Sequence, residues 1–562
     1  MVRGGRDNRP EIGSHALLDN PRTPMTLPRL SLLAAAFVSL AFARPVSGQQ
    51  DDMPHFVQKA GRHALLVDGS PYLVLGGQCG NSSAWPSQLP GVWSAVERMG
   101  ANTLEAPVYW EQFEPKEGSF DTSLVDTLVK EAREHHVHLV LLWFGTWKNG
   151  SSHYLPLWLK EHPELCPKAV GKNGRPVDTP SPHFPAVLEA DKSAFRALMR
   201  RLRAIDPAHT VIMVQVENES GAWNTIRDYS PTAQAIFEQP VPAELLGALG
   251  LSAKAGGSWT AVFGTDADEF FHAWSVARFV GQVAAAGKEE YPLPLYTNAA
   301  LRDPLAHGPA GTYESGGPTD NVLGIWKAAA PALDVLAPDI YLNDNAKYRK
   351  VLELYARPDN PLFVPETGGS PWYAHMLFAA IGQGAVGWSP FGINHVGDPN
   401  APVQDRPAED RLLPVGINFR IVGPIVREVA RLNFEGKLQA VAEDSDVHVQ
   451  TMAFGPWKAV VSYGVPRFGA DSVPKGNPQP IGGAIVGATG QDEFLVAARA
   501  CRVDFQPLDA ASKLQREFLR VEEGAYQDGV FTPTRIWNGD ETDYGLNFSS
   551  LPVALRVRVR TY

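Results

Sequence analysis

The chain has few cysteines, no basic run and no apolar run long enough to span a membrane, and each shortage excludes a class of protein. Among its 562 residues are three cysteines, Cys79, Cys166 and Cys501, so at most one disulfide can form and the fold cannot depend on a disulfide framework. A net charge of −11 argues against nucleic acid as the partner. No histidine, cysteine and aspartate cluster has zinc-ligand spacing, so we expect no metal and no other cofactor.

The longest apolar run lies near the N-terminus. It covers residues 30–43 and follows Met25-Thr-Leu-Pro-Arg, the pattern of a secretory signal peptide. A membrane anchor is the alternative, but a span needs roughly 20 apolar residues. We expect cleavage after Gly48, so that residues 1–48 are an upstream extension and signal peptide. The mature protein is then exported to the periplasm or the extracellular space, without stable membrane insertion.

From about residue 72 to residue 391, short apolar runs alternate with longer amphipathic stretches, a pattern typical of parallel strands separated by helices. The expected strands are residues 72–76, 103–106, 138–143, 211–216, 295–297, 335–341, 362–364 and 385–388. The expected helices include residues 124–135, 192–204 and 268–286. This order predicts a (β/α)8 TIM barrel over residues 49–435, with the active site at the carboxyl ends of the strands. A doubly wound sheet is the alternative, but residues 76–80 lack the dinucleotide-binding glycine spacing.

A last helix is expected over residues 417–432, and the sequence pattern changes after it. Short β-like runs, at residues 459–463, 493–498 and 553–559, are separated by Gly, Pro and Asp. This pattern predicts a smaller all-β, sandwich-like domain over residues 436–562.

Two glutamates stand at the ends of the fourth and seventh expected strands. Glu219 follows Asn218 in the run Gln-Val-Glu-Asn-Glu-Ser-Gly at residues 215–221, and Glu366 lies in the run at 363–369. Side chains at these strand ends face each other across a barrel mouth. Either glutamate alone could be a surface carboxylate. Together they suit retaining glycoside hydrolysis, in which two carboxyl groups roughly 5–5.5 Å apart protonate the leaving oxygen and attack the anomeric carbon.

The barrel resembles clan A of the glycoside hydrolases, in which an Asn-Glu pair ends strand four and a Glu ends strand seven. Within that clan it most resembles family 35, the β-galactosidases. The likeness rests on Asn-Thr-Leu-Glu-Ala-Pro-Val-Tyr-Trp-Glu-Gln-Phe-Glu-Pro at residues 102–115 and on Val-Gln-Val-Glu-Asn-Glu-Ser-Gly at 214–221, and it covers roughly residues 60–430. The C-terminal segment resembles the β-domain found behind the barrel in a bacterial branch of this family.

The resemblance implies a role for each matching residue. It makes Glu219 the general acid/base and Glu366 the nucleophile. Asn218 would donate a hydrogen bond to the 2-hydroxyl of the sugar, and Tyr341 would donate one to the nucleophile. Ser220 and Pro107 stand where the family usually has tyrosine, so these departures leave the specificity for galactose open.

Aromatic and amide side chains near the strand ends are expected to complete the substrate site, because sugar rings stack on aromatic faces. Trp388 ends the eighth strand, and Trp147 and Asn149 lie near the end of the third. We predict that these three residues bind substrate, and that Trp110 is a core residue.

These features predict a retaining exo-β-galactosidase that releases terminal β-galactosyl residues from oligosaccharides or polysaccharides, such as the side chains of xyloglucan. The expected partner is therefore a carbohydrate substrate, and the oligomeric state stays open. Two alternatives remain. One is another clan A glycosidase, namely a β-glucosidase, β-mannosidase or endo-glycanase, and the other is a non-catalytic carbohydrate-binding protein.

Overall fold

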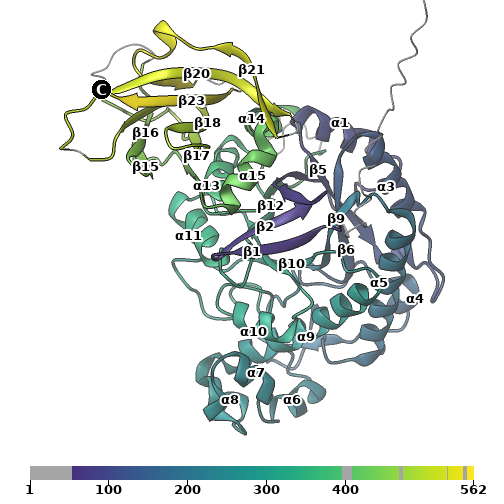
Figure 1. Ribbon diagram of the computed structural model, residues 1–562. Coiled ribbons are helices and arrows are strands. Elements are labelled where there is room, and N and C mark those ends of the chain that lie inside the picture. Colours follow the sequence, from purple (N-terminus) through teal and green to yellow (C-terminus); the bar gives the residue numbers. More distant parts are fainter. Residues whose placement is uncertain (1–52, 395–407, 467–472, 510, 528, 549–552) are drawn as a thin grey trace, which may run out of the picture. The chain divides into compact units, whose positions relative to one another are not determined.

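The computed structural model describes residues 53–394, 408–466, 473–509, 511–527, 529–548 and 553–562 (Figure 1). The expected signal peptide lies outside these residues. Within them, no helix has the length and apolar character needed to cross a membrane. The three cysteines are all buried and free, so no disulfide links them.

Eight parallel strands close into a barrel, which confirms the predicted fold class. Every expected strand has its counterpart. In barrel order they are β4 (Val74–Gln78), β5 (Thr103–Tyr109), β6 (His138–Lys148), β9 (Val211–Asn218), β10 (Leu295–Ala300), β11 (Val335–Ile340), β12 (Phe363–Thr367) and β13 (Gly387–Pro390). All residues of β5, β9 and β12 are buried, as expected for parallel strands covered on both faces.

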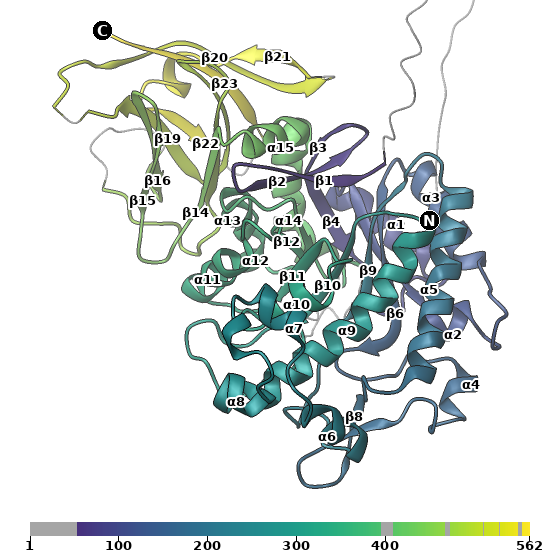
Figure 2. The same cartoon turned by 60° about the horizontal axis from the view of Figure 1, so that its bottom comes forward.

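Helices cover the outside of the barrel. They include α1 (Leu89–Met99), α3 (Ser123–Glu134), α5 (Pro185–Ile205), α9 (Ala267–Glu290), α10 (Leu323–Ala329), α11 (Asn345–Tyr355) and α13 (Met376–Gly382). Helices α5 and α9 lie side by side (Figure 2). Their close approach depends on Gly287, where an added Cβ would lie 2.2 Å from a ring carbon of Phe195.

The helical segment after the barrel differs from the single helix expected over residues 417–432. It consists of α14 (Ala408–Val422), a short 3-10 turn (Gly423–Ile425) and α15 (Val426–Phe434). The expectation of one continuous helix was wrong because Pro424 lacks an amide hydrogen and its ring disfavours an unbroken helix. Helix α15 packs against the small N-terminal sheet of β1 (His55–Lys59), β2 (Arg62–Val67) and β3 (Ser70–Tyr72).

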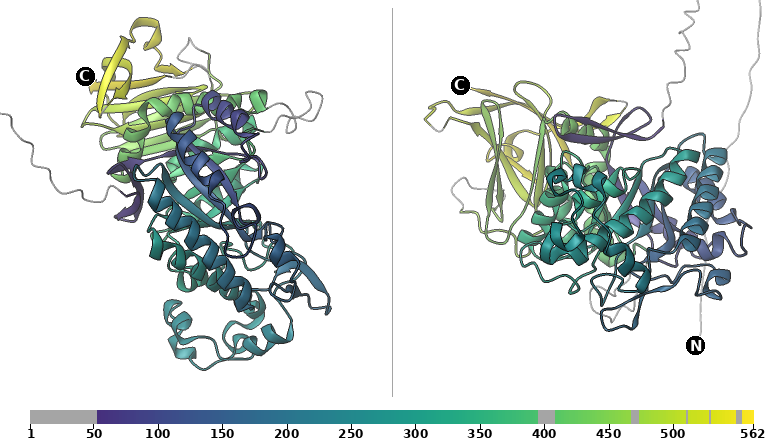
Figure 3. Two further views of the ribbon diagram at one scale, coloured as in Figure 1. Left: turned by 90° about the vertical axis from the view of Figure 1, so that its right-hand side faces the viewer. Right: turned by 90° about the horizontal axis from the view of Figure 1, so that it is seen from below.

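The C-terminal segment forms two antiparallel sheets. One has the order β14-β17-β18-β23-β20-β21 and the other β15-β16-β19-β22. Their bounds are β14 (Leu438–Ala442), β15 (Val449–Phe454), β16 (Trp457–Tyr463), β17 (Gly483–Ala488), β18 (Glu493–Arg499), β19 (Cys501–Pro507), β20 (Arg516–Gln527), β21 (Val530–Ile536), β22 (Leu546–Phe548) and β23 (Ala554–Thr561). The expected runs at 459–463, 493–498 and 553–559 fall on β16, β18 and β23. The green-to-yellow strands of these sheets gather beside the green helices that follow the barrel (Figure 3).

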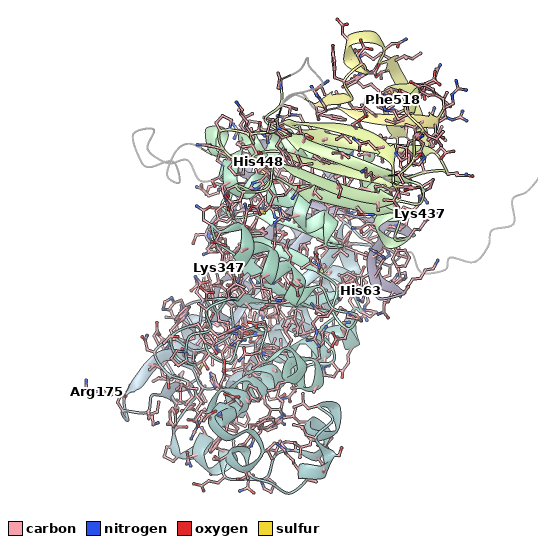
Figure 4. All side chains as sticks on the ribbon, turned by 90° about the vertical axis from the view of Figure 1, so that its left-hand side faces the viewer. His63, Arg175, Lys347, Lys437, His448 and Phe518 are labelled. Carbon is pink, nitrogen blue, oxygen red and sulfur yellow. The ribbon has the colours of Figure 1, made fainter. Side chains whose placement is uncertain are left out.

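Strand β17 shows how the C-terminal sheets join the barrel. Ala484 and Val486 belong to the core between the two sheets, whereas Ile485 belongs to the core that contains the barrel. Alternate side chains of a strand point to opposite faces, so β17 is buried on both faces of the six-stranded sheet. In Figure 4, the label of Lys437, just before β14, marks the C-terminal sheets, and the label of Lys347, on α11, marks the barrel.

Candidate active site

Glu219 directly follows β9 and is held by its backbone on two sides. Its amide donates a 2.9 Å hydrogen bond to Oδ1 of Asn298, and its carbonyl accepts one of 2.9 Å from the amide of Gly150. The φ angle of Glu219 is +44°, a left-handed conformation that L-residues adopt at a cost. The two backbone bonds therefore fix the acid side chain in a direction that the chain would not otherwise favour.

Glu366 lies in β12 and is 7% exposed. Its Oε1 accepts a 2.7 Å hydrogen bond from the hydroxyl of Tyr341, as the sequence predicted, and its Oε2 accepts a 2.9 Å bond from Nε2 of Gln78. Both carboxylate oxygens thus face donors, an arrangement that suits a nucleophile. Tyr341 itself follows β11, and its side chain is 46% exposed at the barrel mouth.

A third carboxyl group, that of Asp339, lies with these two. Glu219, Asp339 and Glu366 each offer an oxygen that lies within 4.8 Å of the others. Oδ2 of Asp339 accepts a 2.6 Å hydrogen bond from Nδ2 of Asn298, and a side-chain hydrogen bond joins the carboxyl groups of Asp339 and Glu219. Asn298 therefore links the backbone of Glu219 to the side chain of Asp339.

Burial and crowding of negative charge raise the pKa of two carboxyl groups in this cluster, Glu219 and Asp339. Burial, reinforced by the charge of Glu366, raises the pKa of Glu219 to about 7, while Lys148 works in the opposite direction. Burial and the charges of Glu366 and Glu219 hold the pKa of Asp339 well above its usual range. Glu219 can therefore hold a proton near neutral pH and release it during a reaction.

Asn218, Asn149 and Lys148 surround the acid on the side of β6 and β9. Asn218 is fully buried, and neither polar atom of its amide group has a partner among the described residues. The backbone amide of Asn149 donates a 3.2 Å hydrogen bond to the carbonyl of Asn218, and its exposed side chain accepts a bond from Nζ of Lys148. The loop after β6 is thus tied to the end of β9.

The two tryptophans predicted to bind substrate are instead core residues. Trp388 has no exposed surface, packs edge-on against Phe419 of α14 and donates its indole hydrogen to Tyr348 of α11, at 2.9 Å. Its neighbour Ser389 points the other way, toward Gly76. The evidence is the position of the Ser389 hydroxyl oxygen, which would lie 2.1 Å from a Cβ added to Gly76. The strand alternation thus aims Trp388 at the helices outside the barrel, and the prediction was wrong.

Trp147 is likewise fully buried and lies edge-on to Phe279 of α9, 4.8 Å between ring centroids. Its backbone amide donates a 2.6 Å bond to Glu217, so the strand end contributes to the scaffold behind the site. The expectation that Trp147 stacks on substrate was therefore also wrong. Trp110 is fully buried, as predicted.

Gln78, Asn298 and Asp339 are the site residues that the sequence analysis missed. Each is a polar residue near the carboxyl end of a barrel strand, namely β4, β10 and β11. That position was the available signal, because the side chains at this end of a TIM barrel converge. The three acids of the cluster are also close enough to share a metal ion, and no other group in the described ranges is. The expected absence of a metal stays a prediction.

Comparison with known families and proteins agrees with this geometry. A model of glycosyl hydrolases family 35 matches residues 64–255, and a model described as a domain of unknown function (DUF5597) matches residues 415–549. The family 35 match is narrower than the resemblance over residues 60–430. It contains Glu219 but not Glu366, so the place of Glu366 in the site depends on the structure.

Curated relatives cover part of the chain. A β-galactosidase of Xanthomonas manihotis is 27% identical over 219 residues, 36% of this chain and 33% of that protein. An exo-β-D-glucosaminidase of Thermococcus kodakarensis is 30% identical over 185 residues, 29% of this chain and 22% of that protein. The matched part therefore spans about a third or less of these relatives. The crystal structure of a β-galactosidase from Bacillus circulans sp. alkalophilus aligns with a TM-score of 0.47 and 14% identity over 64% of this chain and 57% of that one.

The barrel, its paired carboxyls and the match over residues 64–255 make this part of the chain similar to the glycoside hydrolases. Within that class the similarity is to family 35, and residues 415–549 are similar to the DUF5597 model.

Proposed function

We propose that this protein is a retaining exo-β-galactosidase that removes terminal β-galactosyl residues from oligosaccharides or polysaccharides, for example xyloglucan. The observation that supports this proposal most directly is the spacing of the carboxyls. Oxygens of Glu219 and Glu366 within 4.8 Å suit a retaining enzyme, because inverting enzymes keep their two carboxyls about 6.5–9.5 Å apart to admit a water molecule.

The proposed mechanism has two steps. First, an oxygen of Glu366 attacks the anomeric carbon, the glycosidic bond breaks, and the proton of Glu219 passes to the leaving oxygen. Second, a water molecule attacks the anomeric carbon of the glycosyl-enzyme, its proton passes to Glu219, and the bond to Glu366 breaks. Asn218, whose amide group has no hydrogen-bond partner in the described part of the chain, would bind the sugar beside the reacting carbon.

Azide rescue tests this assignment. With a dinitrophenyl β-galactoside, Glu219→Ala should still form the glycosyl-enzyme, because that leaving group departs without protonation. Added azide should then restore turnover and give the β-galactosyl azide. Glu366→Ala should form no covalent intermediate, and any azide product from it should have the α configuration. The reverse pattern of products would show that the two roles are exchanged.

A panel of aryl glycosides decides between this activity and the other clan A activities. β-Galactosides should be the best substrates, with β-glucosides, β-mannosides and β-glucosaminides slower. A higher kcat/KM for another glycoside would replace the galactosidase assignment. Absence of hydrolysis across the whole panel would favour a carbohydrate-binding protein.

We also propose export, with a signal peptide that ends at Gly48. Expression of the full chain in a bacterium should yield a periplasmic or secreted protein whose N-terminal residue is Gln49. A product that keeps residues 1–48 in the cytoplasm would argue against export.

A further inference from the structure

Two of the fourteen tryptophans are exposed: 41% of the surface of Trp85 and 42% of that of Trp223 are accessible to solvent. Trp85 follows β4 and Trp223 follows β9, so both lie in loops at the carboxyl ends of barrel strands, where the catalytic carboxyls are. The ring of Trp85 stacks on Tyr109 at 5.7 Å between centroids. Trp223 stacks on no other ring among the described residues, so its indole is available to a ligand.

The backbone of residue 150 places Trp223 next to the acid/base. An added Cβ on Gly150 would lie 2.7 Å from Cδ1 of Trp223 and 2.6 Å from Oε1 of Glu314, so the indole lies directly against this backbone. The amide of the same glycine donates the 2.9 Å hydrogen bond to the carbonyl of Glu219. Gly150 thus contacts both the exposed ring and the backbone of Glu219.

This position decides which part of a substrate the ring can meet. The acid/base protonates the oxygen of the leaving group, so it must lie on the leaving-group side of the bond that breaks. Trp223 is only four residues further along the chain, in the same loop as Glu219, whereas Glu366 lies three strands away in the barrel order. The exposed amide of Asn149, adjacent to Gly150, adds a hydrogen-bonding group at the same place.

We propose that Trp223 forms a stacking platform for the sugar ring on the leaving-group side of the scissile bond, with Asn149 as a hydrogen-bond partner of that ring. This inference rests on the proposed glycosidase function and deepens it. The platform selects substrates whose galactosyl residue is attached to another sugar, as in an oligosaccharide or polysaccharide. It also binds acceptor sugars: an acceptor hydroxyl attacks the glycosyl-enzyme, its proton passes to Glu219, and Glu366 is released.

The test compares a leaving group that is a sugar with one that is a single ion. Wild type, Trp223→Ala, Trp223→Phe and the matched control Trp85→Ala are assayed on lactose and on a β-galactosyl fluoride, whose fluoride cannot stack. Because aromatic stacking contributes modestly, Trp223→Ala should lower kcat/KM on lactose about five- to tenfold and change it less than about twofold on the fluoride. Trp223→Phe should recover most of the loss. Trp85→Ala should change both substrates by the same factor.

A second readout is the ratio of transfer to hydrolysis, with the fluoride as donor and glucose as acceptor. This ratio should fall in Trp223→Ala and not in Trp85→Ala. Equal losses on lactose and the fluoride, or no loss on lactose, would overturn the platform. Wild-type protein without activity on the fluoride would overturn the proposed function instead, so the two failures are distinguishable.

Discussion

Replacement of Glu366 by glutamine should lower the pKa of Glu219, because it removes the negative charge that lies nearest. Two unit charges 4.8 Å apart repel by about 3.5 kcal/mol at an effective dielectric constant of about 20, which corresponds to about 2.5 pH units. The whole rise, from 4.5 to about 7, has burial as its larger cause. Glu366 is the second cause, so the pKa of Glu219 should fall in Glu366→Gln by roughly 1–2.5, with the Coulomb figure as the larger value.

The measurement is a titration of Glu219 by carbon NMR in protein labelled at the glutamate carboxyl carbons, with Glu219→Gln used to assign the signal. A second arm keeps the native sequence and esterifies Glu366 with a 2-fluoro galactosyl fluoride, which removes the same charge. Both arms should show the lower pKa, and the kcat/KM of wild type should fall above about pH 7, as Glu219 loses its proton. A titration that stays near 7 in both arms would refute the electrostatic coupling between the two carboxyls.

Four further results are expected. Trp388→Ala should lower the free energy of unfolding by about 3–5 kcal/mol in urea denaturation, because the ring is a buried core side chain, and an unchanged stability would contradict that placement. Tyr341→Phe should lower kcat/KM about tenfold or more with little change in stability, because Glu366 loses a charge-assisted hydrogen bond. Because the pKa of Asp339 is raised in the folded protein, this carboxyl destabilises the fold increasingly as the pH rises above about 4. The melting temperature of Asp339→Asn minus that of wild type should therefore be larger at pH 7 than at pH 4. An equal difference at both pH values would argue against a raised pKa. EDTA should leave activity unchanged, and restoration of a lost activity by a divalent ion would show that the acidic cluster binds a metal.

The sequence by itself determined the barrel and its two principal carboxyls. Eight apolar runs separated by helix-like segments predict a barrel of parallel strands, and strand ends four and seven must then lie at one mouth. Glu219 and Glu366 were accordingly predicted from their positions at strand ends, and the bond from Tyr341 was predicted from the resemblance to family 35. In the C-terminal segment, short β-like runs separated by Gly, Pro and Asp were enough to predict β structure.

Tertiary structure alone decided which side chains at the strand ends face the lumen. Trp388 and Ser389 are neighbours, yet only Ser389 points inward, because adjacent residues of a strand alternate and a shift of one residue reverses them. Asp339 and Asn298 come from separate strands and meet only when β10 and β11 pair, so no local pattern marks them as partners of Glu219. The raised pKa of Glu219 likewise depends on burial and on the charge of Glu366. Glu366 is 147 residues further along the chain, and only the fold brings oxygens of the two carboxyls within 4.8 Å of each other.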